Sequence, residues 1–184
     1  MRCTCYEIGG DVFSLAELNC CVIRGNLSRP ISPKSPYVDV PKKSNAYRFY
    51  ALDRVDTRIN FVLNTGDFSC PQTIPVLTPD RLQSQLDAAA ALFVRSQLTV
   101  DVAKRVITIP KICDVYRHDF GNGDHTVAIM FCVTFLNDSD REDVMRLLQN
   151  ENQGPLYMKY QPTSEQYHSC LKAWKDKQNG SDEC

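Results

Sequence analysis

Two different hydrophobic periodicities follow each other in the middle of this sequence, and together they restrict its fold class. In residues 58–63, Ile59 and Phe61 recur at a period of two, which is typical of a β-strand that ends before Gly66. Twelve residues after Gly66, Thr78 with Pro79 and Asp80 predicts the start of a helix. Five apolar side chains fall on one face of that helix: Leu82, Leu86, Ala89, Ala90 and Phe93. We therefore expect an α/β (α+β) chain in which residues 58–63 lie at or next to the centre of the sheet.

The N-terminal region predicts a strand, a turn and a helix. Residues 6–8 and 12–13 are strand-like, and Gly9-Gly10 lies between them as a turn. Ser14 and Glu17 have the spacing of a capping box, in which each side chain satisfies a backbone N–H at the start of a helix. We expect this helix to end near Gly25.

The second half of the chain predicts further short elements around one ambiguous stretch. Residues 105–109 and 156–160 are expected to be strands, a short helix follows Pro110, and Ser139 with Glu142 predicts a second capping box. Residues 127–136 are apolar at almost every position, which fits a buried strand or a helix that is buried all round. We expect one domain over residues 6–160, a helix over 161–176 and a disordered tail over 177–184.

The segment 28–43 carries four prolines and is expected to be a long loop, because proline disrupts helices and central strands. A surface loop is the simpler interpretation. A proline-rich ligand in extended form, or phosphorylation at Ser32 or Ser35, are the alternatives.

Composition excludes several function classes. The chain of 184 residues has 21 basic and 22 acidic side chains and a formal net charge of −1, which argues against nucleic acid as a partner. No apolar signal core or membrane-length segment is present, so we expect a soluble, cytoplasmic protein with no membrane partner. An odd count of nine cysteines without a secretory signal indicates mostly reduced thiols.

Cys70 is the best candidate for a reactive side chain. It follows the predicted strand in a loop of small residues, where catalytic groups are often displayed. A thiol enzyme also needs a base and a group that orients the base, and we name His118 and Asp119 for these roles. The competing interpretation is that Cys70 is structural, as most unpaired cysteines are. No paired-cysteine metal motif and no phosphate-binding loop appears, so we predict no metal site and no cofactor.

Three ordered segments resemble a known family. They read YEIGGDVFSLAELNCCVIRGN, YALDRVDTRINFVLNTGDFSCP and ITIPKICDVYRHDFG. In this order they are similar to the signature blocks of the family catalogued as domain of unknown function 547. The resemblance implies an α/β domain and marks these family-signature positions: Gly10, Arg24, Asp56, Arg58, Asn60, Asn64, Ser69 and Tyr116.

The departures from the family pattern favour a protein without catalysis. Members often have His where this chain has Cys20 and Asn60, and Cys where it has Thr65. Asparagine cannot exchange a proton near neutral pH, and threonine has no low-pKa thiol. We therefore expect a possible pseudoenzyme that acts as a scaffold or protein-interaction module. In this interpretation Arg58 pairs with Asp56 or Asp119, Asn64 bonds the backbone of the turn, and Cys70 packs beneath the loop.

Two further expectations follow from the resemblance. Members usually carry an apolar helical segment before the Gly-Gly block, so this chain is expected to be N-terminally truncated and to leave an apolar face for a protein partner. The alternative function is a thiol-dependent hydrolase or transferase of papain-like or transglutaminase-like type that uses Cys70. Redox sensing through the pairs Cys3 with Cys5 and Cys20 with Cys21 is a weaker option.

Overall fold

The structure, a computed structural model, describes residues 5–24, 49–52, 54–64, 69–71, 73–150 and 154–162. The chain forms two compact units, one of Met1–Thr57 with Cys113–Phe131 and the other of Arg58–Ile112 with Cys132–Cys184. Helices occur with a small antiparallel sheet and a small mixed sheet, which confirms the α+β class. The predictions of a loop over residues 28–43 and a tail over 177–184 lie outside the described residues, as does the helix predicted over 161–176 apart from its first two residues.

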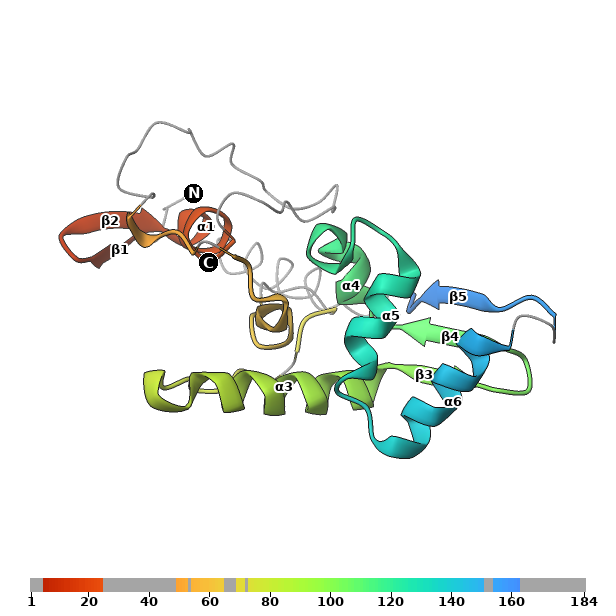
Figure 1. Cartoon of the computed structure of the whole chain (residues 1–184). Helices are drawn as coiled ribbons and strands as arrows, with labels where there is room; N and C mark the ends of the chain where they lie inside the picture. Colours follow the sequence, from red (N-terminus) through yellow and green to blue (C-terminus); the bar gives the residue numbers. More distant parts are fainter. Residues whose placement is uncertain are drawn as a thin grey trace, which may run out of the picture. The chain divides into compact units, whose positions relative to one another are not determined.

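The first unit begins with a hairpin, at the position of the predicted strand and turn. Strands β1 (Cys5–Ile8) and β2 (Asp11–Ser14) pair antiparallel around Gly9 and Gly10, whose φ angles are +63° and +88° (Figure 1). Positive φ is the conformation that glycine adopts without steric cost. The buried Phe13 ring packs edge-to-face on Tyr50, with centroids 5.3 Å apart. Residues 49–52 are thereby tied to the hairpin.

A helix follows the hairpin directly, as predicted. Ser14 and Glu17 form both hydrogen bonds of the capping box at the start of α1 (Leu15–Glu17). The helix continues as the π-helix η1 (Leu18–Ile23) and ends at Arg24. Its end is joined to residues 49–52 by the hydrogen bond from Leu52 N–H to the Val22 carbonyl, 3.0 Å long.

The ambiguous apolar stretch is helical. The chain runs through α4 (Lys111–Val115) and the 3₁₀ turn η4 (Arg117–Phe120) into α5 (His125–Val133). Ala128, Ile129, Cys132 and Val133 are buried, while Val127 and Met130 are exposed. This burial pattern follows successive helical turns and not strand alternation.

Residues 58–63 are not a strand, so the predicted centre of the sheet was wrong. They lie in and after the 3₁₀ helix η2 (Thr57–Phe61), where the N–H groups of Val62 and Leu63 both donate to the Ile59 carbonyl. These local bonds occupy the groups that a strand would offer to a neighbour. Four consecutive residues, 59–62, are buried, whereas a strand with one buried face would alternate.

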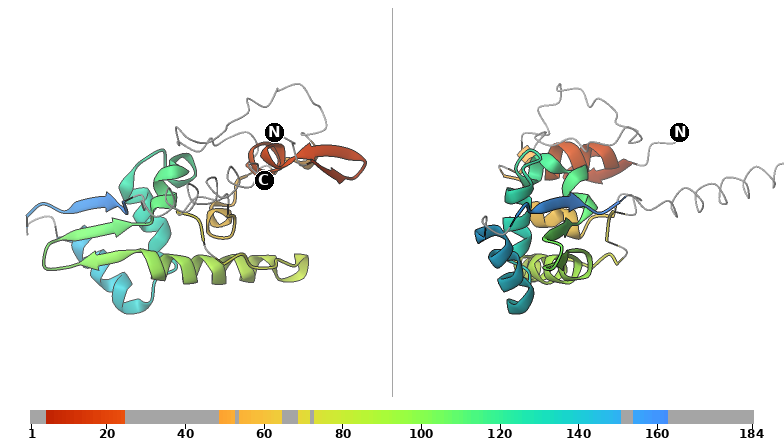
Figure 2. Two further views of the ribbon diagram at one scale, coloured as in Figure 1. Left: turned by 180° about the vertical axis from the view of Figure 1, so that it is seen from behind. Right: turned by 90° about the vertical axis from the view of Figure 1, so that its right-hand side faces the viewer.

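The sheet of the second unit has three strands in the order β3 (Thr99–Asp101), β4 (Val106–Ile109) and β5 (Tyr157–Tyr160). β3 and β4 are antiparallel, while β4 and β5 are parallel, so the expected small mixed sheet is confirmed. Helix α6 (Asp138–Gln149) covers one face of this sheet, as opposite views show (Figures 1 and 2).

The long predicted helix precedes β3. The 3₁₀ turn η3 (Pro79–Arg81) leads into α3 (Leu82–Gln97), which buries Leu86, Ala90 and Val94. Thr78 stands before the helix as predicted, but its side chain makes no capping bond. Instead, its backbone N–H donates to the Gln85 side-chain oxygen at 2.8 Å.

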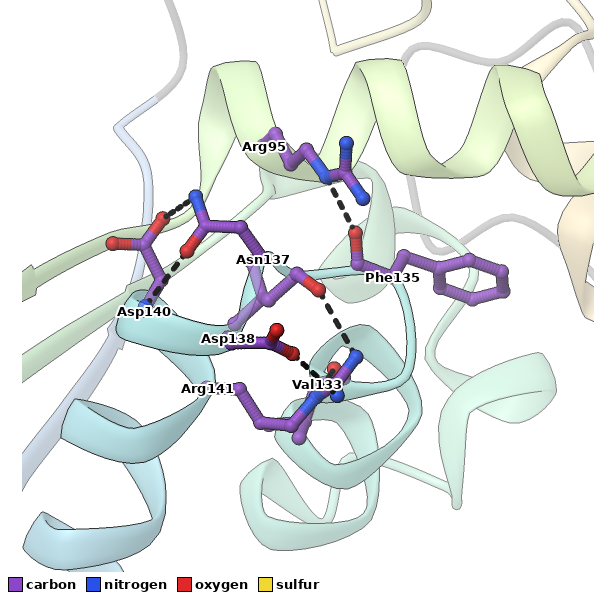
Figure 3. A network of polar contacts seen from close by, with 8 residues as sticks. Arg95, Val133, Phe135, Asn137, Asp138, Asp140 and Arg141 are labelled. Atoms are coloured by element: carbon purple, nitrogen blue, oxygen red, sulfur yellow. Dashed lines mark hydrogen bonds and ion pairs between the residues drawn. The ribbon is translucent and has the colours of Figure 1, made fainter.

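A polar network fixes the connection between α5 and α6 (Figure 3). Asn137, and not the predicted Ser139–Glu142 box, caps α6 by accepting a hydrogen bond from the Asp140 N–H at 2.8 Å. Arg95 of α3 donates to the Phe135 carbonyl at 2.9 Å, and Arg141 donates to the Leu136 carbonyl at 3.0 Å. Arg141 also donates to the carbonyl of Val133, the last residue of α5, at 3.3 Å, so guanidinium groups satisfy backbone carbonyls at the helix end and in the connection that follows it.

Candidate functional site

A buried ion pair in the first unit joins two family-signature segments. Arg24, at the end of η1, donates through Nη1 to Oδ2 of Asp119 in η4. Their side chains are only 1% and 2% exposed. The guanidinium also lies 4.0 Å from the centroid of the Tyr116 ring, within cation–π range.

The surroundings of this pair hold it in one geometry. Arg24 Nε donates to the Asn19 side-chain oxygen at 3.3 Å, and Thr57 Oγ1 donates to the Asp119 carbonyl at 3.3 Å. Buried charges persist when they are paired and hydrogen-bonded, because an unpaired one loses its hydration without compensation. The arrangement therefore links η1, residue 57 and η4, which are distant in sequence.

His118 faces a different environment from its neighbour Asp119. Its side chain is exposed, and its Nδ1 lies 2.8 Å from Oδ1 of Asn122. Asp119, the predicted orienting acid, is instead bonded to Arg24. Sequence reasoning missed Asn122, although its i, i+4 spacing from His118 was a usable signal.

Cys70 belongs to the second unit and is 2% exposed, as the structural interpretation of this cysteine expects. Beside it, Asn64 Nδ2 donates to the Pro71 carbonyl at 3.0 Å, so Asn64 does bond the backbone of this loop. His118 and Asp119 belong to the other unit, and their catalytic pairing with Cys70 stays a prediction.

The remaining signature positions divide between the two units. Arg58 pairs with Asp87 of α3 at 2.7 Å and also donates to the Gln83 carbonyl of the same helix. The sequence did not indicate that Arg58 contacts α3. Asn60 is 1% exposed inside η2, and Gly10 forms the hairpin turn. Asp56 and Ser69 are half-buried, and Cys20 lies in η1.

Metal and membrane features were also sought in the described ranges. There, no three His, Cys, Asp or Glu side chains gather in a way that could hold a metal ion. None of the helices in that part of the chain is both long and apolar enough to cross a membrane.

Fold and site together define an α+β domain in which Arg24, Asp119 and Tyr116 form a buried cluster. A family model described as "Protein of unknown function, DUF547" matches residues 1–94, about half of the 184-residue chain. The chain belongs to this family. No curated protein and no solved structure matches it.

Proposed function

We propose that this protein is a non-catalytic scaffold or protein-interaction domain of the cytoplasm. The observation that supports it best is the cluster of Arg24, Asp119 and Tyr116, in which the polar signature residues contact one another inside the fold. Arg58 and Asn64 likewise bond other parts of their own unit. Polar side chains that bond to one another within a unit stabilise its fold. We therefore expect the function to reside in side chains on the surface.

The hairpin offers a surface for a protein partner. Four apolar side chains of β1, β2 and α1 are exposed at fractions of 45%, 43%, 65% and 63%: Tyr6, Ile8, Val12 and Leu15. Within the described residues the sheet of β1 and β2 has only these two strands. Tyr6 and Ile8 lie on one face of the hairpin, because side chains alternate along a strand. Val12 is paired with Glu7 and therefore lies on the other face. Exposed apolar side chains that share a face are typical of protein contact sites, so the partner is expected on the face of Tyr6 and Ile8.

Site-directed photo-crosslinking tests this role. A photoreactive amino acid at Ile8 should give one discrete crosslinked protein in cells that express the chain, and Tyr6→Ser, on the same face of β1, should weaken that product. The matched control is Leu92 of α3, which is 72% exposed but lies in the other unit. Equal crosslinking from both positions would contradict a specific interface at the hairpin. Turnover of a thioester, peptide or glutamine substrate that disappears in Cys70→Ala would contradict the non-catalytic role.

A second candidate function is a thiol-dependent hydrolase or transferase that uses Cys70. One observation favours it: His118 has an orienting partner, Asn122, and a thiol enzyme needs an oriented base. Iodoacetamide labelling across pH would detect a thiolate at Cys70. Labelling no faster than that of the exposed Cys5 at neutral pH would exclude this candidate.

A further inference from the structure

The loop between η4 and α5 has a backbone that few sequences can adopt. Gly121, Asn122 and Gly123 have φ angles of +83°, +60° and +94°. Asparagine is among the few residues other than glycine that tolerate this left-handed region. A Cβ at Gly121 would lie 2.6 Å from the Cβ of Val127, so the close approach of the loop to α5 also requires glycine there.

This backbone brings the Asn122 side chain to His118. The Asn122 N–H donates to the Arg117 carbonyl at 2.8 Å, which closes the turn, and the side-chain Oδ1 then lies 2.8 Å from Nδ1 of His118. A carbonyl oxygen can only accept a hydrogen bond. Nδ1 therefore carries the hydrogen in this contact, and Nε2 of the neutral ring is the acceptor.

We propose that Asn122 is a positioning residue, which holds neutral His118 in the Nδ1–H tautomer and leaves Nε2 as a proton acceptor open to solvent. Backbone strain is often retained where it places a functional group. The proposed tautomer follows from the geometry of the turn alone. A role of His118 as general base for a thiol rests in addition on the second candidate function above. The ligand class that fits such a base is a molecule or side chain with a dissociable thiol or hydroxyl proton.

Nitrogen-15 NMR of the full chain, labelled at histidine, tests the tautomer directly. The chain has three histidines, and His118→Gln assigns the relevant signals. Spectra are recorded near pH 8.5, where an ordinary imidazole with a pKa of about 6.5 is neutral. The wild-type ring should show a pyrrole-type Nδ1 and a pyridine-type Nε2.

Two variants at Asn122 separate positioning from folding. Asn122→Gly keeps the left-handed backbone but removes the acceptor, and should shift the tautomer ratio about fivefold toward Nε2–H, the effect of one ordinary hydrogen bond. Asn122→Asp retains an acceptor and should restore the Nδ1–H form. Unchanged signals from His125 confirm that the fold is intact.

A wild-type ring dominated by Nε2–H, or a ratio that Asn122→Gly leaves unchanged, would overturn the inference. Iodoacetamide labelling of Cys70 is the separate measurement for the thiol enzyme. A held tautomer together with an unreactive Cys70 would reject the enzyme and leave the positioning role established.

Discussion

Replacing Asp119 with asparagine should destabilise the first unit strongly. The variant keeps the size of the side chain but removes the carboxylate charge that the Arg24 guanidinium, 1% exposed, contacts. Breaking a buried ion pair on one side costs about 3–5 kcal/mol, because the remaining charge stays desolvated. At about 2–4 °C per kcal/mol for a chain of this size, the expected fall in Tm is roughly 6–20 °C.

The double variant Arg24→Met with Asp119→Leu should be closer to wild type than Asp119→Asn alone. Removing both charges leaves no uncompensated ion, and apolar replacements of buried pairs are often tolerated. Urea unfolding followed by circular dichroism measures the free energy of unfolding of each variant. Hydrogen exchange of the Asp119 amide, which donates to the Tyr116 carbonyl at 2.8 Å, reports on the first unit itself.

The exposed pair of Lys104 and Asp101 is a matched control. Its atoms are 2.9 Å apart, but the side chains are 79% and 40% exposed. Asp101→Asn should cost less than about 1 kcal/mol, as is usual for surface pairs. The reasoning fails if Asp119→Asn costs as little as this control, or if the double variant costs the sum of its two single substitutions.

Three smaller effects are expected at the hairpin and at the loop of the second unit. Gly9→Ala should lower the free energy of unfolding by about 1–3 kcal/mol, measured in urea, because the backbone has positive φ and the new Cβ would lie 2.5 Å from Tyr50 Oη. Tyr50 has a raised pKa because it donates a hydrogen bond to the Asp11 carboxylate, so ultraviolet titration should show Asp11→Asn lowering that pKa. The associated stability is present below about pH 10 and is lost as the pH rises through the raised pKa, which unfolding at alkaline pH would reveal. Asn64→Ala should cost about 0.5–1 kcal/mol in thermal unfolding, since it removes the bond to the Pro71 carbonyl.

The sequence correctly predicted the turns and helices whose residues interact with near neighbours along the chain. The Gly9-Gly10 turn and the capping box of Ser14 and Glu17 depend on residues within three positions of each other, and both are confirmed. The helix predicted after Thr78 is also confirmed, because its apolar stripe spans several turns.

Tertiary context decided the rest. The alternation in residues 58–63 was misleading, because η2 is buried on all sides at residues 59–62 and a fully buried segment carries no period. Asn60 stands where family members often have His, but its side chain is buried there at 1% exposure. The partner of Asp119 could not be deduced either, because Arg24 is 95 positions away along the chain.

The separation of Arg24 from Asp119 limits how this domain can be shortened. The family match ends at residue 94, but the carboxylate that neutralises Arg24 comes from residue 119. A polypeptide cut at the family boundary would retain Arg24 and lose the Asp119 carboxylate that it contacts. A piece of the chain that keeps this ion pair must therefore extend at least through residue 119, well beyond the end of the family match.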